Sequence, residues 1–410
     1  MWETIRIADF GSVITGKTPS SNNPEHFGDD YPFITPTDIG AGRIVHTDRG
    51  ISEEGYLKFR RQILPRWSVC FVCIGATIGK ICLTTEKSLT NQQINSVVVD
   101  TTRHDPFFVY YLLSTYAEAV KGIAGGAATP IVNKTSFENI EVVVPPLPTQ
   151  QKIAAILSAY DDLIENNLRR IKILEDMAQN LYREWFVKFR FPGHQHARFI
   201  DSPLGRIPER WEVKKLDQVV AFQNKGTEAG EHLSDRVYFP IDCIPRKSLA
   251  ISETGSWKDA QSSLHLFDAG DILFGAMRPY FHKVVVAPFK GVTRKTCFVF
   301  KCALLEYHAF AALTLFQDST VSFANAHSKG ATIPYAVWPH SMDGMPVVVP
   351  ASEQSEKFED AVGPMIARIG TMFFQNTTLR RTRDLLLPRL ISGEVDVSEL
   401  DIAVPEEALT

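Results

Sequence analysis

The sequence predicts a mixed α/β (α+β) fold in which two globular domains are separated by two long helices that form an antiparallel coiled coil. Two observations support this fold class. The chain contains an internal repeat, and each repeat ends in a long segment whose apolar residues follow heptad spacing. At 410 residues, the chain also exceeds one ordinary hydrophobic core. We therefore expect an internal pseudo-twofold repeat in the order globular, helical, globular, helical.

The repeat has an offset of about 203 residues. "PRWSVCFVCIGATIGK" (65–80) aligns with "DAGDILFGAMRPYFHK" (268–283), and "TNQQINSVVV" aligns with "TRKTCFVFKC". Shorter phrases also correspond: "YPFITPTDI" parallels "VYFPIDCI", "GAATP" parallels "KGATIP", and "IEVVVPPLPTQQ" parallels "MPVVVPASEQ". Each half therefore predicts short strands with a few helices, then an apolar "VVVP" strand, then a long helix.

These patterns divide the chain into five expected parts. They are globular domain 1 at 1–148, helical region 1 at 149–191, globular domain 2 at 192–350, helical region 2 at 351–395 and a C-terminal tail at 396–410.

The two helical regions carry apolar seams of equal length with alternating steps of four and three. The first seam runs through Ile153, Leu157, Tyr160, Ile164, Asn167, Ile171, Leu174, Ala178, Leu181 and Trp185, and the second through Phe358, Val362, Met365, Ile369, Met372, Asn376, Leu379, Arg383, Leu386 and Leu390. An antiparallel pairing predicts Trp185 beside Phe358, Leu157 beside Leu386, and Asn167 beside Asn376. Pro364, after Gly363, and Pro388 predict a late start or a kink in the second helix.

"GSVITGKT" (11–18) fits the phosphate-binding signature G-x-x-x-x-G-K-[ST] at every required position. That signature requires a long helix directly after its last residue. Pro19 and the turn-forming "PSSNNPE" that it begins predict a loop there instead, because a residue before proline avoids helical geometry. These residues argue against a P-loop NTPase, which stays as an alternative function.

Composition excludes several functional classes. The 43 Lys and Arg residues against 47 Asp and Glu exclude a uniformly basic coat for nucleic acid, although a local basic surface remains possible. The absence of a long apolar run or a signal-like start predicts a cytoplasmic protein. Cys70 and Cys73 lie in a predicted strand, where odd spacing directs their thiols to opposite faces, so no metal site is expected.

Several phrases together resemble one known family, the specificity (S) subunits of type I restriction-modification systems. They are "GKTPS" followed by "YPFITPTDIG", "ILPRWSVCFVCIGATIGKI", "NQQIN", "VVVPPLPTQQKIAAILSAYDDLIENNLRRIKILEDMAQNLYREWF" and the end "RDLLLPRLISGEV". The resemblance covers essentially the whole chain and explains "GKTPS" as a loop of a target-recognition domain. In the second half, "QNKGTEAG" has no such match.

The resemblance implies a non-catalytic subunit that reads a bipartite double-stranded DNA target, one half with each target-recognition domain. It also implies two methyltransferase (M) subunits docked on the helices, which methylate adenine N6, and restriction/translocase (R) subunits. The expected cofactors, S-adenosylmethionine, ATP and magnesium, would be bound by those partners and none by this chain. The residues agree, because neither the F-x-G-x-G turn of a methyltransferase nor its N6-adenine motif is present.

DNA contacts are expected from loops of both domains. Lys and Arg suit phosphates, whereas Gln, Asn and some Arg side chains can read base edges. The candidates in domain 1 are Lys17, Thr18, Ser20, Lys80, Gln92, Gln93 and Asn95. Those in domain 2 are Lys225, Arg246, Lys247, Arg278, Tyr280, Arg294, Lys295 and Lys329.

Contacts with a methyltransferase subunit are expected from the first turns of helical region 1. The candidates are Gln150, Gln151, Ile153, Ile156 and Leu157. Ile156 has an alternative role in packing on domain 1. Two other classes of protein stay open from the residues alone: a coiled-coil scaffold that does not read DNA, and a single-chain enzyme.

Overall fold

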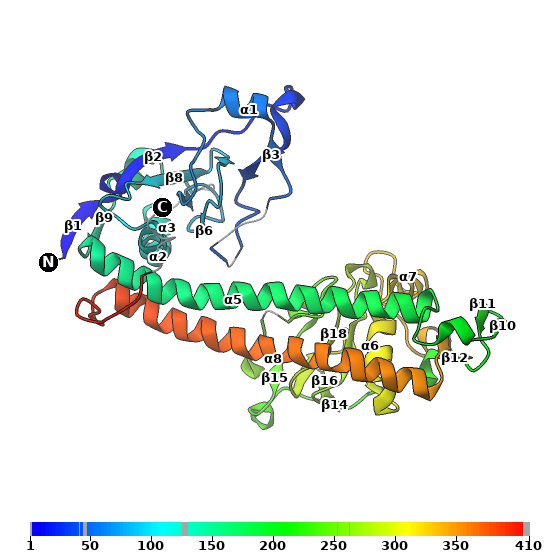
Figure 1. The fold of residues 1–410 in the computed structure, drawn as a ribbon. Coiled ribbons are helices and arrows are strands. Elements are labelled where there is room, and N and C mark those ends of the chain that lie inside the picture. Colours follow the sequence, from blue (N-terminus) through cyan, green and yellow to red (C-terminus); the bar gives the residue numbers. More distant parts are fainter. Residues whose placement is uncertain are drawn as a thin grey trace. The chain divides into compact units, whose positions relative to one another are not determined.

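The computed structural model describes residues 2–40, 42–43, 47–124, 130–251, 253–261 and 263–404. The chain divides into two compact units. Unit 1 comprises residues 1–165 and 378–410, and unit 2 comprises residues 166–377. Two long helices, α5 (Leu147–Tyr182) and α8 (Ser352–Ile391), each contribute to both units (Figure 1). Within the described part of the chain, no helix is both long and apolar enough to cross a membrane.

Unit 1 is built on a four-stranded antiparallel sheet with strand order β2-β8-β5-β6. Its strands are β2 (Gly11–Thr15), β8 (Ile94–Val99), β5 (Val69–Val72) and β6 (Ile81–Leu83). A second sheet has the order β4-β3-β7, formed by Gly50–Ile51, Phe27–Ile34 and Leu89–Thr90, and β1 (Glu3–Arg6) pairs with β9 (Glu141–Val144). The helices are α1 (Glu53–Lys58), α2 (Pro106–Thr115), α3 (Ala117–Ile123) and α4 (Lys134–Glu138).

Unit 2 repeats this plan. Its main sheet has the order β13-β20-β17-β18, formed by Val220–Phe222, Cys297–Cys302, Ile272–Gly275 and Val284–Val286. Its second sheet has the order β14-β16-β19-β15, formed by Gly226–Thr227, Leu264–Phe267, Gly291–Arg294 and Val237–Tyr238. Strand β12 (Glu212–Lys215) pairs with β21 (Pro346–Val349), the hairpin β10 (Phe199–Ser202) and β11 (Gly205–Pro208) is additional, and the short helices are α6 (His308–Leu315) and α7 (Asp318–Ala326).

The registers of the two main sheets confirm the sequence repeat. Val72 pairs with Ile94 in unit 1, and Gly275 pairs with Cys297 at the same offset in unit 2. In each unit a parallel pair follows in the second sheet, β3 with β7 and β15 with β19. Of the "GAATP" phrase, only Pro130 lies among the described residues, so most of that correspondence falls outside them.

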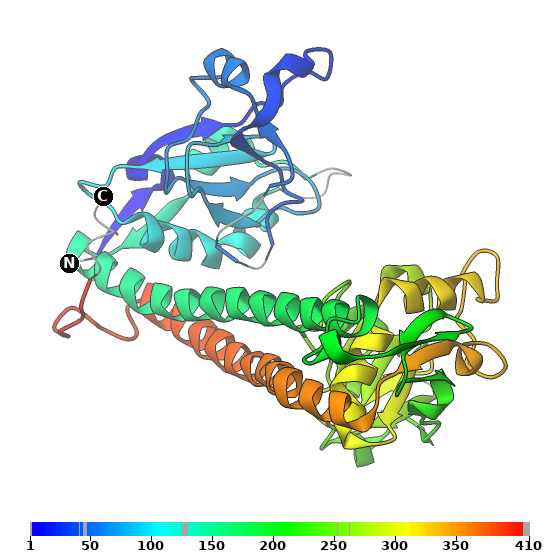
Figure 2. The same ribbon diagram turned by 45° about the vertical axis from the view of Figure 1, so that its right-hand side comes forward.

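Helices α5 and α8 pack antiparallel, as Figures 1 and 2 both show. The predicted register is confirmed. Trp185, in a π-helical turn that continues α5, lies 5.5 Å from Phe358 between ring centroids, and Leu157 and Leu386 belong to one apolar cluster. Asn167 Nδ2 donates to Asn376 Oδ1 at 2.9 Å. The seam therefore contains an amide pair among mostly apolar residues.

The predicted late start of the second helix is wrong. Helix α8 begins at Ser352 and continues through both Pro364 and Pro388. A proline removes one backbone hydrogen bond from a helix interior, which costs stability. Phe358 and Val362, both fully buried on the N-terminal side of Pro364, and Ile369 on the other side anchor α8 in unit 2, and this packing offsets the missing bond.

Unit 1 holds the helix pair through a buried polar network. Helix α2 lies against β5 and β6 on one side and reaches α5 on the other, where Tyr111 donates to Asp161 at 2.5 Å. Arg383 of α8 forms an ion pair with the same carboxylate, which is only 5% exposed. Arg43, also buried, forms ion pairs with Asp162 and Glu165 of α5. Unit 1 is thus joined to its part of the helix pair by charges as well as by apolar contacts.

Candidate nucleic-acid interface

Three loops meet at one end of the main sheet of unit 1. The "GKTPS" loop follows β2, a second loop (73–80) joins β5 to β6, and "NQQ" precedes β8. Backbone bonds hold the first and third loops together, because Lys17 N donates to Thr90 O at 2.8 Å and Gly16 N donates to Ile94 O at 3.1 Å. Thr18 Oγ1 also donates to the side-chain oxygen of Gln92. "GKTPS" begins at residue 16 and "NQQ" at residue 91, and the fold brings them into one surface.

The packing of Gly16 explains the phosphate-loop pattern. A Cβ atom at Gly16 would lie 2.2 Å from the carbonyl oxygen of Asn91, so only glycine fits there. No α-helix occurs between Thr18 and Glu53 in the described part of the chain, and a phosphate loop requires one directly after Thr18. The glycine therefore serves contact between two loops, which removes the structural basis for the NTPase alternative.

The candidate DNA-binding residues of unit 1 differ in exposure. Lys17, Thr18, Ser20 and Gln92 are exposed, and Gln93 is half-buried. The Gln93 side-chain oxygen accepts from Asn91 Nδ2 at 2.9 Å, so Asn91, which sequence reasoning did not single out, positions this amide. These residues form an exposed edge with one cation, two hydroxyls and two amides, which suits contacts to phosphates and bases.

Two other candidates of unit 1 support the loops from inside. Asn95 is 4% exposed, and its side-chain oxygen accepts from Thr15 at 2.7 Å, so it cannot reach a base in this structure. The Lys80 ammonium donates to the carbonyl oxygens of Pro36 and Ile39 at 3.0 and 2.7 Å. Lys283 occupies the equivalent place in unit 2 and donates to Ile241 O at 2.6 Å. The shared lysine therefore holds a neighbouring loop in both units.

The corresponding end of unit 2 gathers most of its candidates. Seven of them are exposed and Arg278 is half-buried; the exposed seven are Lys225, Arg246, Lys247, Tyr280, Arg294, Lys295 and Lys329. The Arg246 guanidinium lies over the Phe281 ring at 3.8 Å, and Lys247 N donates to His282 O at 2.8 Å. This contact brings loop 245–250 beside the loop that joins β17 to β18.

Tyr335 connects the remaining loops of unit 2. Its backbone pairs with Lys329 through bonds of 2.8 and 2.9 Å, and its hydroxyl donates to the carbonyl oxygen of Lys295. Burial raises the pKa of Tyr335 to about 12, so the hydroxyl keeps its proton near neutral pH. Lys295, Lys329 and the Arg278 loop therefore share one framework, in which both lysines are exposed and Arg278 is half-buried.

The first turns of α5 correct the prediction of a partner surface. Ile153 and Leu157 are 1% and 0% exposed in the core of unit 1, and Gln150 is 1% exposed. Gln150 accepts from Asp105 N at 3.1 Å and donates to Pro145 O at 2.9 Å. These three side chains hold the domain together and present nothing to a partner. Gln151 is half-buried, and Ile156 packs against the core cluster, as its alternative role anticipated.

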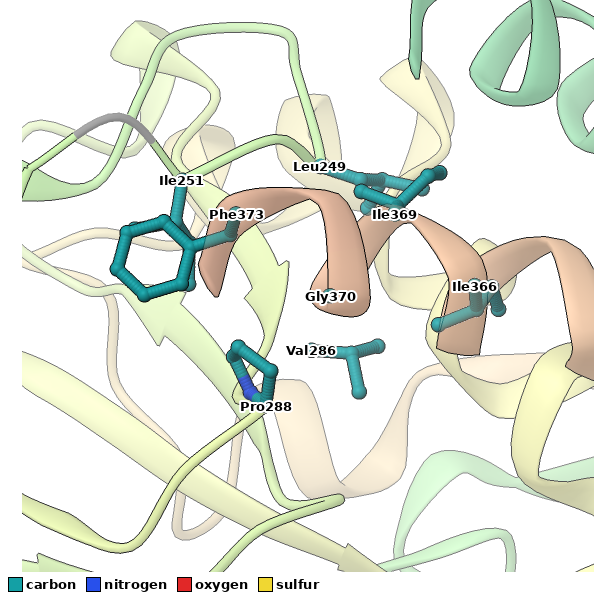
Figure 3. A pocket seen from close by; sticks show the side chains of 8 residues that line it. All are labelled: Leu249, Ile251, Val286, Pro288, Ile366, Ile369, Gly370 and Phe373. Atoms are coloured by element: carbon teal, nitrogen blue, oxygen red, sulfur yellow. The ribbon is translucent and has the colours of Figure 1, made fainter. Parts of the chain in front are cut away.

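An apolar pocket of unit 2 and a group of metal-ligand atoms in unit 1 are both poor candidates for holding a cofactor or an ion. Figure 3 shows an apolar pocket between α8 and unit 2, lined by residues that include Gly370, Pro288 and Phe373. Its volume of about 10 Å³ holds at most one water, so it is a packing gap. Glu25, His26 and Glu54 bring three ligand atoms within 4.8 Å of one another. The two glutamates are exposed, and exposed acidic groups often lie close together without binding an ion.

The fold and this loop surface define a class of protein in which two similar β domains are carried on one antiparallel helix pair. Residues 1–175 match the family model described as "Type I restriction modification DNA specificity domain". The chain is 28% identical over 418 residues to the type I restriction enzyme MjaIX specificity subunit of Methanocaldococcus jannaschii, covering 97% of this chain and 94% of that protein. It is 33% identical over 181 residues to the HindI specificity subunit of Haemophilus influenzae, covering 42% of this chain and 39% of that protein.

Among solved structures, the type I restriction-modification S subunit from M. genitalium has the same fold, with a TM-score of 0.61 at 14% identity, covering 95% of this chain and 96% of that one. The chain belongs to the DNA-specificity subunits of type I restriction-modification systems. As a member of that family it is a non-catalytic component of a larger complex and binds no cofactor itself.

Proposed function

We propose that this specificity subunit reads a bipartite double-stranded DNA target, with one half-site for each β domain. The observation that carries the proposal is the repeated loop framework: both units have the same strand order, and both place exposed cations and polar side chains at the same end of the main sheet. In this proposal residues 1–148 and 192–350 are the target-recognition domains, residues 149–191 and 351–395 are the helical regions, and residues 396–410 are a tail.

The side chains divide by chemistry. Exposed lysines and arginines hold phosphates and set the salt dependence of binding, because each neutralised phosphate releases counterions. Amides and some arginines read base edges through paired hydrogen bonds. Gln92 and Gln93 are the amide candidates of domain 1, whereas Asn95 and Lys80 support the loops that present them.

The partners in this proposal are two methyltransferase subunits and the restriction/translocase subunits, all acting on DNA in the cytoplasm. Those subunits carry S-adenosylmethionine, ATP and magnesium and methylate adenine or cleave DNA. The partner contact on α5 is reduced to Gln151 and Ile156, because Gln150, Ile153 and Leu157 are buried.

Mapping the methylated motif tests the proposal. Cells that express this chain with its partner subunits are compared by methylation-sensitive sequencing for wild type, for Gln92→Ala with Gln93→Ala, and for Arg294→Ala with Lys295→Ala. We expect the first double variant to degrade one half of the motif and the second double variant to degrade or weaken the other half. If either double variant degraded both halves equally, the assignment of one half-site to each domain would be wrong.

A further inference from the structure

The repeat places Gly75 of domain 1 and Arg278 of domain 2 at the same point of the fold. Gly75 N donates to Pro130 O at 2.9 Å, and Arg278 N donates to Pro334 O at 2.8 Å. Both residues have positive φ, +92° for Gly75 and +52° for Arg278. Each lies in the loop just after its strand, β5 in domain 1 and β17 in domain 2, and these strands pair with β8 and β20 at equivalent positions.

This loop has two positions with positive φ, a backbone geometry that favours glycine, and only domain 1 has glycine at both of them. Gly79 has φ of +94°, and its counterpart His282 has φ of +51°. Side chains with a Cβ pay a conformational cost in this left-handed region, so a retained side chain there indicates a role for it. For His282 the role is structural. Its ring is buried, Nε2 donates to Phe316 O at 2.8 Å, and Nδ1 lies 3.2 Å from Asp318.

Arg278 has no such internal role. Its side chain is half-buried, and its Nε atom is buried without a hydrogen-bond partner in the described part of the structure. A buried donor without an acceptor is costly, because it has lost water and gained nothing in return. Because Nε is closed off from solvent, a ligand from outside the chain would meet the outer nitrogens of the half-buried guanidinium, and the strained backbone is the observation that points to such a ligand.

The residue that faces Gly75 in domain 1 is a long one, Gln93, whereas its counterpart in domain 2 is the shorter Thr296. In domain 1 a Cβ on Gly75 would lie 3.5 Å from the side-chain nitrogen of Gln93. Gln93 O accepts from Cys73 N at 2.8 Å, and Thr296 O accepts from Ala276 N at 2.9 Å, so Thr296 is the counterpart of Gln93. Each domain therefore has one long hydrogen-bonding side chain here, from the "NQQ" loop in domain 1 and from the opposite loop in domain 2. The Gln93 amide accepts from Asn91 Nδ2 at 2.9 Å and donates to Ile74 O at 3.5 Å, so it meets a base through its second lone pair and second N–H.

We propose that this shared position reads a base, and that Arg278 selects guanine in the half-site of domain 2 where Gln93 selects adenine in that of domain 1. The inference rests on the proposed function and adds the base class to it. A guanidinium donates two hydrogen bonds to guanine O6 and N7, whereas a glutamine amide matches adenine N6 and N7. The same place in the repeat thus recognises different bases.

The test is Arg278→Gly, which installs the residue that domain 1 has at this point and removes backbone strain. The full chain is expressed with its partner subunits, and methylated motifs are sequenced. We expect the thermal midpoint of the purified chain to be unchanged or higher. One guanine in the domain 2 half should become degenerate, with discrimination falling about 5- to 150-fold, while the domain 1 half stays unchanged.

Two further variants control the result. His282→Gly also removes strain but deletes a structural side chain, so it should lower the thermal midpoint without changing the motif. Gln93→Ala should relax one adenine in the domain 1 half only.

Other outcomes are separable. If Arg278→Gly weakens binding equally for all sequences and lowers the salt slope by about one, Arg278 holds a phosphate and the inference is overturned. If it leaves the motif unchanged while Gln92→Ala with Gln93→Ala still degrades the other half, the inference fails but the proposed function stands. If variants of either domain alter both halves together, the proposed function fails as well.

Discussion

Asn167 donates a hydrogen bond from its side-chain nitrogen to the side-chain oxygen of Asn376, and the two residues form the only amide pair in the predicted helix seam. Asn376 is 3% exposed, so its amide depends on this partner. We expect Asn376→Leu to lower the free energy of unfolding by about 1–3 kcal/mol, because it leaves Asn167 without its acceptor.

The double variant Asn167→Leu with Asn376→Leu should recover most of that loss, since apolar pairs replace amide pairs at little cost. Urea unfolding of the full-length chain measures both effects. If the double variant were as unstable as Asn376→Leu, the amide pair would contribute more to stability than the hydrogen bond that each asparagine supplies to the other.

The Asp161 network gives a second stability prediction. Asp161 is buried and accepts from Tyr111 and Arg383. Arg383→Met should lower the free energy of unfolding by about 3–5 kcal/mol, because it leaves a buried carboxylate without its cation. Arg389→Met is the matched control on the same helix. Arg389 pairs with Glu394 in an exposed ion pair, so its loss should cost less than about 1 kcal/mol. Similar losses in the two variants would contradict this account.

Asp105 predicts a specific pH dependence. Burial raises its pKa from 3.8 to about 6, although backbone N–H groups, including that of Phe108 at 2.8 Å, oppose the rise. The folded state therefore binds this proton more tightly than the unfolded state. Its contribution favours folding at acidic pH and is lost as the pH rises from about 4 to about 6, a change of up to about 3 kcal/mol.

Asp105→Asn tests this sign. Asparagine caps the α2 N-terminus as well as aspartate does but carries no proton to lose. We expect the variant to be more stable than wild type at pH 7 and nearly equal to it at pH 4, as measured by urea unfolding at both values. The difference between the two proteins isolates Asp105 from His104, whose own pKa is lowered by burial. A gap that is constant across pH would refute the prediction.

Gln150 and Gln151 separate stability from assembly. Gln150→Ala should destabilise unit 1, because Asp105 N and Pro145 O lose their partner. Gln151→Ala should leave the thermal midpoint unchanged and weaken co-purification with the methyltransferase subunit, since the Gln151 side chain is part of the proposed contact. If Gln151→Ala and a folded Ile156→Ala variant both assembled with the methyltransferase subunit as well as wild type does, the contact would not lie at these residues.

The helix pair could be predicted from sequence in detail because its contacts are periodic. Heptad spacing determines which side of each helix is buried, and the asparagine in each seam then supports the antiparallel register. The ring contact of Trp185 with Phe358 and the Asn167 pair both follow from that argument. The prolines gave a wrong signal, because packing on either side of Pro364 outweighs their local cost.

The sequence predicted which loops form the candidate interface, but not which of their side chains point outward. "GKTPS" and "NQQ" do lie together, yet whether an amide points outward depends on partners far away in sequence. Asn95 faces inward because Thr15 lies on the neighbouring strand, and Lys80 is held by carbonyls about 40 residues before it. The Asp161 network had one local signal, the charged Arg383, which with Asn376 interrupts the apolar residues of the second seam.

Unit 1 is assembled from both ends of the chain, and this has a consequence for biosynthesis. Leu390 and Ile391 at the end of α8 and Val397 beyond it are buried in the core of unit 1, and Gly393 packs on Trp2 near the start of β1. A ribosome therefore releases all of unit 2 before it supplies the residues that close unit 1. At about 5–20 residues per second, the first domain waits about 10–40 s for its missing core. During that interval the nascent N-terminal domain exposes apolar surface while the later domain can already fold, an inversion of the usual order of co-translational folding.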